Sequence, residues 1–168
     1  STLVMRQNVS VYDVLREAPE AVILSPGPGR PENTGVTLEL LAALPEEVPV
    51  LGICLGPQTL AHYLGGTVGR AKEPRHGKAS TLTHDGHFLF DGIASPFAAG
   101  RYHALIVESL PASCDSLATS AQGENMALAH KTLPLYGLQF HPESILTPEG
   151  RRMIENFLTH AVPQEAAA

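Results

Sequence analysis

The sequence predicts an α/β protein with a mostly parallel central sheet, flanked by helices and carrying a small β-rich insertion. Short apolar runs alternate with helical patterns between residues 22 and 64, which is typical of βαβ units. The middle of the chain changes to short runs of β-forming residues, and an apolar run and an amphipathic helix follow it. We expect a single domain over residues 1–160 and a disordered C-terminal tail over residues 161–168.

Two buried strands are predicted in the first part of the chain. Val22-Ile23-Leu24 is a short apolar run that ends at the loop Ser25-Pro26-Gly27-Pro28-Gly29. Residues 48–53 form a second apolar run, which leads directly into Cys54. Helical patterns follow both runs, so the strands are expected to be parallel and joined by right-handed crossovers.

Two helices are predicted beside these strands. Residues 34–44 have apolar side chains at helical spacing, and Asn33 or Thr34 is a suitable N-cap. Residues 57–64 form the next helix, which the pair Gly65-Gly66 ends.

The β-rich insertion extends from Gly66 to Lys131. Asp85-Gly86 is expected to form a hairpin turn within it. Residues 135–140 then return to a buried strand, and residues 148–160 form an amphipathic helix. The β-forming runs are Ala79–Thr83, Phe97–Arg101, Leu105–Val107, Ser116–Ser120 and Met126–His130.

Composition narrows the class of protein. The 168 residues are 43% hydrophobic and 17% charged, with a net charge of −6, and they show no basic run. This balance argues against a nucleic-acid partner, and no apolar run reaches the ~18 residues of a membrane helix. With no visible signal peptide and only two cysteines, Cys54 and Cys114, we expect a cytoplasmic protein with reduced thiols.

Cys54, His141 and Glu143 are the candidate catalytic residues. Cys54 follows a buried strand on a turn flanked by Gly52 and Gly56, an arrangement that lifts a nucleophile above a sheet. His141 follows a later strand and has a carboxylate two residues on, so it can act as a base with Glu143 orienting it. Together they predict an activated cysteine nucleophile.

The turn also predicts how charge is stabilised. A helix N-terminus and a nearby imidazole favour the thiolate of Cys54, which would otherwise be a few per cent ionised at neutral pH. After attack on a carbonyl, the oxyanion needs backbone donors. Leu55 N–H, directly after the nucleophile, and Gly27, in a loop that ends a neighbouring strand, are the candidates.

Five blocks give the chain a family resemblance. It resembles the class I (triad) glutamine amidotransferases, in particular the glutaminase subunit of the anthranilate synthase and aminodeoxychorismate synthase type, whose fold is flavodoxin-like. The blocks, in the family's order, are Ser25-Pro26-Gly27-Pro28-Gly29-Arg30-Pro31, Gly52-Ile53-Cys54-Leu55-Gly56-Pro57-Gln58, His76-Gly77-Lys78, Arg101-Tyr102-His103-Ala104-Leu105 and Gly137-Leu138-Gln139-Phe140-His141-Pro142-Glu143-Ser144.

The resemblance implies a function. Cys54, assisted by the other two triad residues, would form a glutamyl thioester and release ammonia from L-glutamine. Gln58 and the backbone of Ala104 and Leu105 would hold the amino-acid end of the substrate. Residues 76–78 would help to position a chorismate-binding synthase subunit, in a heterodimer or heterotetramer, to which ammonia would be channelled. No metal or organic cofactor is implied for this half-reaction.

Three features depart from the family. Histidine is usual where Pro57 stands, and proline removes one N–H near the nucleophile, although it suits a first helical turn. Serine is usual where Ala104 stands. Related chains begin with a strand and helix that carry an Asn-Tyr-Asp-Ser-Phe-like segment, whereas Ser1–Arg6 already resembles their second strand. The sequence therefore predicts a sheet without that first strand and helix.

Alternative interpretations remain at this stage. Taken alone, Cys54 is compatible with a buried structural cysteine, whereas its flanking glycines and the histidine block favour a nucleophile. A catalytically impaired paralogue that acts as a binding or regulatory subunit would fit the departures from the family. A cysteine hydrolase of similar fold acting on another amide is disfavoured by Gln58 and the block at residues 101–105.

Overall fold

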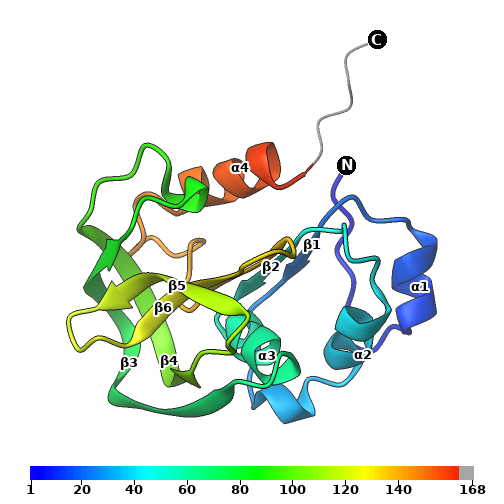
Figure 1. Cartoon of the computed structure of the whole chain (residues 1–168), viewed down its shortest axis with the longest axis horizontal. Helices are drawn as coiled ribbons and strands as arrows, with labels where there is room; N and C mark the ends of the chain where they lie inside the picture. The colour runs from blue at the N-terminus through cyan, green and yellow to red at the C-terminus, as the bar shows by residue number, and fades with distance from the viewer. Residues whose placement is uncertain (163–168) are drawn as a thin grey trace.

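Residues 1–162 are described by the computed structural model, and they form a curled, mixed sheet with helices packed around it (Figure 1). The expected tail lies outside the described residues from position 163 on, and before it Ala161 ends the last helix and packs against the core. The elements are α1 (Val11–Arg16), β1 (Val22–Leu24), η1 (Pro31–Asn33), α2 (Val36–Ala43), β2 (Val50–Ile53), α3 (Leu55–Tyr63), β3 (Thr67–His84), η2 (Phe88–Phe90), β4 (Phe97–Ser109), β5 (Cys114–Ser120), β6 (Asn125–His130), β7 (Leu135–Leu138) and α4 (Gly150–His160).

The sheet has the strand order β1-β2-β7-β6-β5-β3-β4. β1, β2 and β7 are parallel, so their carboxyl ends meet at one edge of the sheet. The remaining neighbours are antiparallel. This confirms the α/β class, but the sheet is mixed rather than mostly parallel. Parallel pairing is confined to three strands, because the β-rich segment joins the same sheet through the short connections that antiparallel strands permit.

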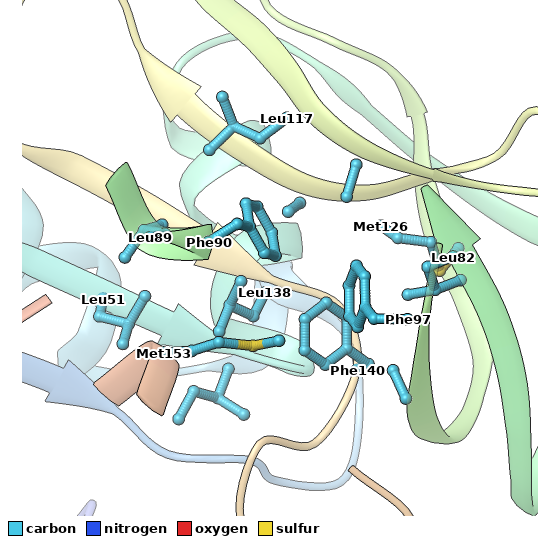
Figure 2. Close-up of a cluster of buried hydrophobic side chains, with 14 of the residues drawn as sticks. Leu51, Leu82, Leu89, Phe90, Phe97, Leu117, Met126, Leu138, Phe140 and Met153 are labelled. Atoms are coloured by element: carbon cyan, nitrogen blue, oxygen red, sulfur yellow. The ribbon is translucent and has the colours of Figure 1, made fainter. Parts of the chain in front are cut away.

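Both faces of the parallel strands are covered by helices. Successive residues of a strand point to opposite faces, and on β2 Val50 clusters with Leu60 of α3 whereas Leu51 belongs to the cluster that contains Met153 of α4. Figure 2 shows this second cluster, in which Phe140 lies among the side chains that α4 covers. The core thus fixes β2 and β7 side by side, which sets the position of the residues that follow them.

The β-rich segment is more continuous than its pattern predicts. β3 and β4 are long, and they pair with a break in register between Arg70 and Arg75. The expected hairpin turn at Asp85-Gly86 is wrong, because the β3–β4 ladder closes at the pair Leu82–Phe97 and the connection contains η2. The buried aromatic and aliphatic side chains of η2 make this longer connection part of the core.

The helix starts differ slightly from those predicted. α2 begins after Gly35, without a side-chain cap, and the Thr34 hydroxyl instead donates to the carbonyl of Pro31 at 2.8 Å. Neither Asn33 nor Thr34 therefore caps this helix. α3 begins directly after Cys54, two residues earlier than expected. Within residues 1–162, no helix has the length and apolar character that crossing a membrane requires.

The first residues do not form the strand that they resemble. Ser1–Arg6 have no regular structure, and Leu3 and Val4 are 61% and 88% exposed. A strand needs a hydrogen-bonded neighbour, and among the described residues β1 pairs only with β2. α1, which the apolar pattern did not predict, is stabilised by a capping box between Ser10 and Asp13.

Candidate active site

Cys54 lies on a strained turn between β2 and α3. Its φ of 57° and ψ of −90° are rare for a residue with a side chain and cost about 1–3 kcal/mol. Its N–H donates to the carbonyl of Leu138 at 2.8 Å, and its carbonyl accepts from the side chain of Gln139 at 3.1 Å. A Cβ on Gly52 would lie 2.5 Å from the carbonyl carbon of Gly56, so the sharp turn requires the glycine predicted there.

His141 and Glu143 follow β7, at the same sheet edge as Cys54. His141 Nδ1 lies 2.6 Å from Glu143 Oε1. Because a carboxylate accepts, Nδ1 carries the hydrogen, and in the neutral imidazole Nε2 then carries a lone pair. Nε2 is buried and has no hydrogen-bond partner among the described residues, which is unusual for a buried polar atom. Glu143 therefore orients the imidazole through Nδ1, while Nε2 is left without a hydrogen bond from the described residues.

The backbone around His141 is fixed by contacts that the sequence patterns did not reveal. Its N–H donates to the carbonyl of Gly100 at 3.0 Å. The hydroxyl of Thr147 donates to the carbonyl of His141 at 2.6 Å and accepts from Gly100 N–H at 2.8 Å. The ring of Tyr102 meets the imidazole in an edge geometry, with centroids 4.9 Å apart. β4 thus holds the imidazole from the side of the β-rich segment.

The thiol of Cys54 is not activated in the ground state. Burial raises its pKa to about 11, the negative charge of Glu143 adds to the increase, and a hydrogen bond from Leu55 N–H opposes it. The expected contribution of the helix start is present as this hydrogen bond, but burial outweighs it, so the net shift disfavours the thiolate. To act as a nucleophile, Cys54 would need a base, and Nε2 of His141, which has no hydrogen-bond partner among the described residues, is suited to that role.

Leu55 and Gly27, the candidate oxyanion donors, lie next to each other. Leu55 is the first residue of α3, and its N–H already points at the sulfur of Cys54. A Cβ on Gly27 would lie 3.6 Å from the Leu55 side chain, which places the loop after β1 against the helix start. The structure thus brings the two residues that were predicted as oxyanion donors together at the start of α3.

Gln58 and the backbone at residues 104–105 are also brought together. The Gln58 side chain is buried, and its amide nitrogen donates to the carbonyl of Leu105 and to Gln139 Oε1, each at 3.0 Å. Both donors are used inside the protein, so only its carbonyl oxygen is left for a ligand. Ala104 is exposed and lies where the β3–β4 register jumps, outside the regular ladder.

Gln139 lies in the candidate site, although the sequence patterns did not single it out. It is 1% exposed and joins Gln58 to the carbonyl of Cys54. A signal for it was present: it is a polar residue in an otherwise apolar run, and a buried amide needs partners on both of its atoms.

Pro57 is accommodated as expected. It is the third residue of α3, where a helix N–H has no intrahelical partner to lose. It packs against β7 so closely that a Cβ on Gly137 would lie 2.5 Å from the Cβ of Pro57. The proline therefore fills the space between helix and sheet beside the nucleophile.

A surface hollow of about 470 Å³ lies next to the pair formed by His141 and Glu143. The side chain of Glu143 is 56% exposed, so its carboxylate remains accessible to solvent. The hollow is lined by Ile53, Pro142, Glu143, Arg151, Ile154 and Glu155.

Comparison with known proteins gives the family. The model of the family described as glutamine amidotransferase class-I matches residues 2–161. The chain therefore belongs to the class I glutamine amidotransferases, which confirms the resemblance inferred from its motifs.

Two relatives and one solved structure show which members of the family the chain is similar to. The chain is 42% identical over 160 residues to aminodeoxychorismate/anthranilate synthase component 2 of Bacillus subtilis, covering 93% of this chain and 82% of that protein. It is 44% identical over 152 residues to the bifunctional protein TrpGD of Thermotoga maritima, covering 89% of this chain but 26% of that protein. The crystal structure of a putative GMP synthase subunit from Thermoplasma acidophilum superposes with a TM-score of 0.82 at 26% identity, covering 92% of this chain and 78% of that one.

Proposed function

We propose that this chain hydrolyses L-glutamine through Cys54, His141 and Glu143 and supplies the ammonia to a chorismate-aminating synthase subunit. The observation that carries the proposal is the oriented imidazole. Glu143 holds Nδ1 at 2.6 Å, and Nε2, which has no partner among the described residues, belongs to a histidine at the sheet edge where Cys54 follows β2. This is the nucleophile, base and orienter arrangement of acyl transfer.

The first half of the reaction forms a thioester. Nε2 of His141 takes the proton from the Cys54 thiol as the sulfur attacks the side-chain carbonyl carbon of glutamine. The N–H groups of Leu55 and Gly27 stabilise the negative charge on the carbonyl oxygen. The imidazolium returns the proton to the departing nitrogen, the C–N bond breaks, and ammonia leaves.

The second half regenerates the enzyme. His141 takes a proton from water, whose oxygen attacks the thioester carbon. The C–S bond breaks, the proton returns to the sulfur, and glutamate is released. A thiol whose pKa is about 11 is a poor spontaneous nucleophile, which confines proton transfer to the moment when glutamine is in place.

The amino-acid end of glutamine is assigned to Gln58 and the backbone of Ala104 and Leu105, which Gln58 contacts through a hydrogen bond to the Leu105 carbonyl. The carbonyl oxygen of Gln58 is suited to accept from the substrate ammonium. The irregular backbone at Ala104 and the neighbouring Leu105 supply further polar groups at the exposed break in the β3–β4 register.

The likeness to a component 2 protein motivates the choice of partner. We assign the chain the same kind of role, in which the acceptor of ammonia is chorismate bound to a second subunit. The branch, anthranilate or aminodeoxychorismate, depends on that subunit. A reducing, cytoplasmic setting suits a protein whose two cysteines are both free thiols.

A catalytically impaired subunit that only binds its partner is the second candidate. The raised pKa of Cys54 and the N–H that Pro57 removes near the oxyanion favour it. In that case glutamine would not be hydrolysed, although the complex would still form.

Glutamate release by the complex with its synthase subunit separates the two candidates. Wild-type protein and Cys114→Ala are expected to be equally active, whereas Cys54→Ala is expected to lose activity. Cys114 is the matched control, since it is also a buried free thiol but lies on β5. Equal rates for Cys54→Ala and wild type would refute the proposed function, and no hydrolysis by any of the three would favour the impaired subunit.

A further inference from the structure

The molecule contains a buried ion pair that the reaction above does not use. Arg101 on β4 donates to Glu124, which precedes β6, at 3.1 Å, and their side chains are 1% and 3% exposed. Burying two charges is costly unless their remaining hydrogen-bonding groups are satisfied. The contacts around the pair therefore show what it holds in place.

Glu124 is fixed from two strands. Its Oε1 accepts from the backbone N–H of Lys72 at 2.7 Å, and its Oε2 accepts from Arg101. Lys72 lies on β3 within the break in the β3–β4 register, so the carboxylate supports this irregular segment. A second nitrogen of Arg101, Nε, donates to His103 Nε2 at 3.0 Å.

That contact determines the tautomer of His103. A guanidinium group can only donate, so Nε2 of His103 must carry a lone pair. The hydrogen of the neutral imidazole then sits on Nδ1, which lies 2.9 Å from the carbonyl oxygen of Leu105 and donates to it. Arg101 thus makes His103 a fixed donor to the backbone.

Leu105 connects this assembly to the catalytic turn. Its carbonyl also accepts from Gln58 Nε2, which donates its second hydrogen to Gln139 Oε1. Gln139 Nε2 in turn donates to the carbonyl of Cys54. Each donor and acceptor in the series is matched, so the hydrogen-bonded path runs without interruption from the ion pair to the nucleophile.

We propose that Arg101 and Glu124 are positioning residues that lock His103 as an Nδ1–H donor and thereby hold the Leu105 carbonyl and the Gln58 amide in their glutamine-binding geometry. The catalytic consequence rests on the proposed glutaminase function, whereas the tautomer does not. The assembly explains why β4 carries a charged side chain in the core and why a histidine next to the site takes no part in proton transfer.

The electrostatics around His103 agree with a permanently neutral ring. Burial lowers its pKa to about 4, and the charge of Arg101 contributes to the decrease. The hydrogen bond to Leu105 and the charge of Glu124 oppose it, and His141 acts in the same direction as Arg101. The ring therefore stays neutral at physiological pH.

Nitrogen NMR of His103 in the purified chain tests the tautomer without any turnover. In wild type we expect Nδ1 protonated and Nε2 unprotonated from pH 8 to below pH 6. In the charge-free double variant Arg101→Gln/Glu124→Gln, the obligate donor to Nε2 is gone, so a measurable fraction of the Nε2-protonated tautomer should appear at pH 8. A wild-type ring with Nε2 protonated, or an unchanged tautomer in the double variant, would overturn the proposal.

Glutaminase kinetics of the complex test the positioning role. His103→Leu removes the donor to Leu105 and should raise KM for glutamine about tenfold with a much smaller change in kcat. His103→Asn places an amide N–H where Nδ1–H was and should restore KM to within about threefold of wild type. Equal KM values in all three proteins, or a loss confined to kcat, would show that the assembly serves stability alone. If His103→Leu does not fold, the NMR measurement on the wild-type ring still tests the tautomer.

Discussion

Glu143 has two opposing effects on the site, and replacing it separates them. Its carboxylate orients His141, which the proposed reaction requires, and its charge raises the pKa of Cys54, which opposes thiolate formation. Glu143→Gln should therefore slow glutamine hydrolysis while making the sulfur more reactive toward a small neutral electrophile. A merely structural role for Glu143 would not produce changes of opposite sign.

The size of each effect follows from the structure. An amide in place of the carboxylate can donate to Nδ1 and leave the proton on Nε2, so His141 loses its function as base, a loss of about 10³–10⁴ in rate. The pKa of Cys54 is about 11 instead of 9.0, with burial the larger cause. Removing the charge should lower it by up to about one pH unit, which increases the thiolate fraction at pH 8 about threefold to tenfold.

Glutamate release by the complex measures the rate of glutamine hydrolysis. Alkylation of Cys54 by iodoacetamide at pH 8, followed by intact mass, measures the reactivity of the sulfur. Glu155→Gln is the matched control, since Glu155 lines the same hollow but pairs with Arg151 at 2.8 Å. This control should match wild type in both assays. Alkylation of Glu143→Gln that is no faster than wild type would refute the assignment of the raised pKa to Glu143.

Three further predictions concern stability, each measured by urea unfolding. Because the pKa of Cys54 is raised in the folded state, the free energy of unfolding of wild type should fall by about 2–3 kcal/mol relative to that of Cys54→Ala as the pH rises from 9 to 11. Parallel pH profiles of the two proteins would contradict this. Because the pKa of His103 is lowered in the folded state, the free energy of unfolding of wild type should fall by up to about 3 kcal/mol relative to that of His103→Asn as the pH falls from 6.5 to 4. A difference in unfolding free energy that does not change with pH would count against a neutral buried ring. Gly52→Ala should lower the free energy of unfolding by about 3 kcal/mol or more, since the added Cβ would meet only backbone atoms. Gly27→Ala should lower it by less than about 1 kcal/mol, because its Cβ has room. Equal losses in the two variants would contradict the close approach at Gly52.

The catalytic candidates could be predicted from sequence because their signals are local. Cys54 and His141 each follow an apolar run directly, and parallel strands bring their carboxyl ends to one edge. The β1 and β2 strands and three of the helices were predictable for the same reason, since their periodicity is contained within a few turns or residues.

The remaining features depend on contacts between distant residues. Arg101 and Glu124 are 23 positions apart, and nothing in either segment indicates that they meet inside the core. The length of β3 depends on its pairing with β4, which tolerates a break in register. The pKa of Cys54 depends on its burial, which the motif around it does not encode.

Covalent capture of Cys54 tests directly whether this residue is the nucleophile that attacks glutamine. The complex is incubated with a glutamine-like electrophile, and the chain is analysed by intact mass and peptide mapping. One adduct is expected, on Cys54, and excess glutamine should prevent it. Cys114 should stay unmodified, and His141→Asn should form no adduct. An unmodified Cys54 in wild type, or labelling that glutamine does not prevent, would contradict this role of Cys54.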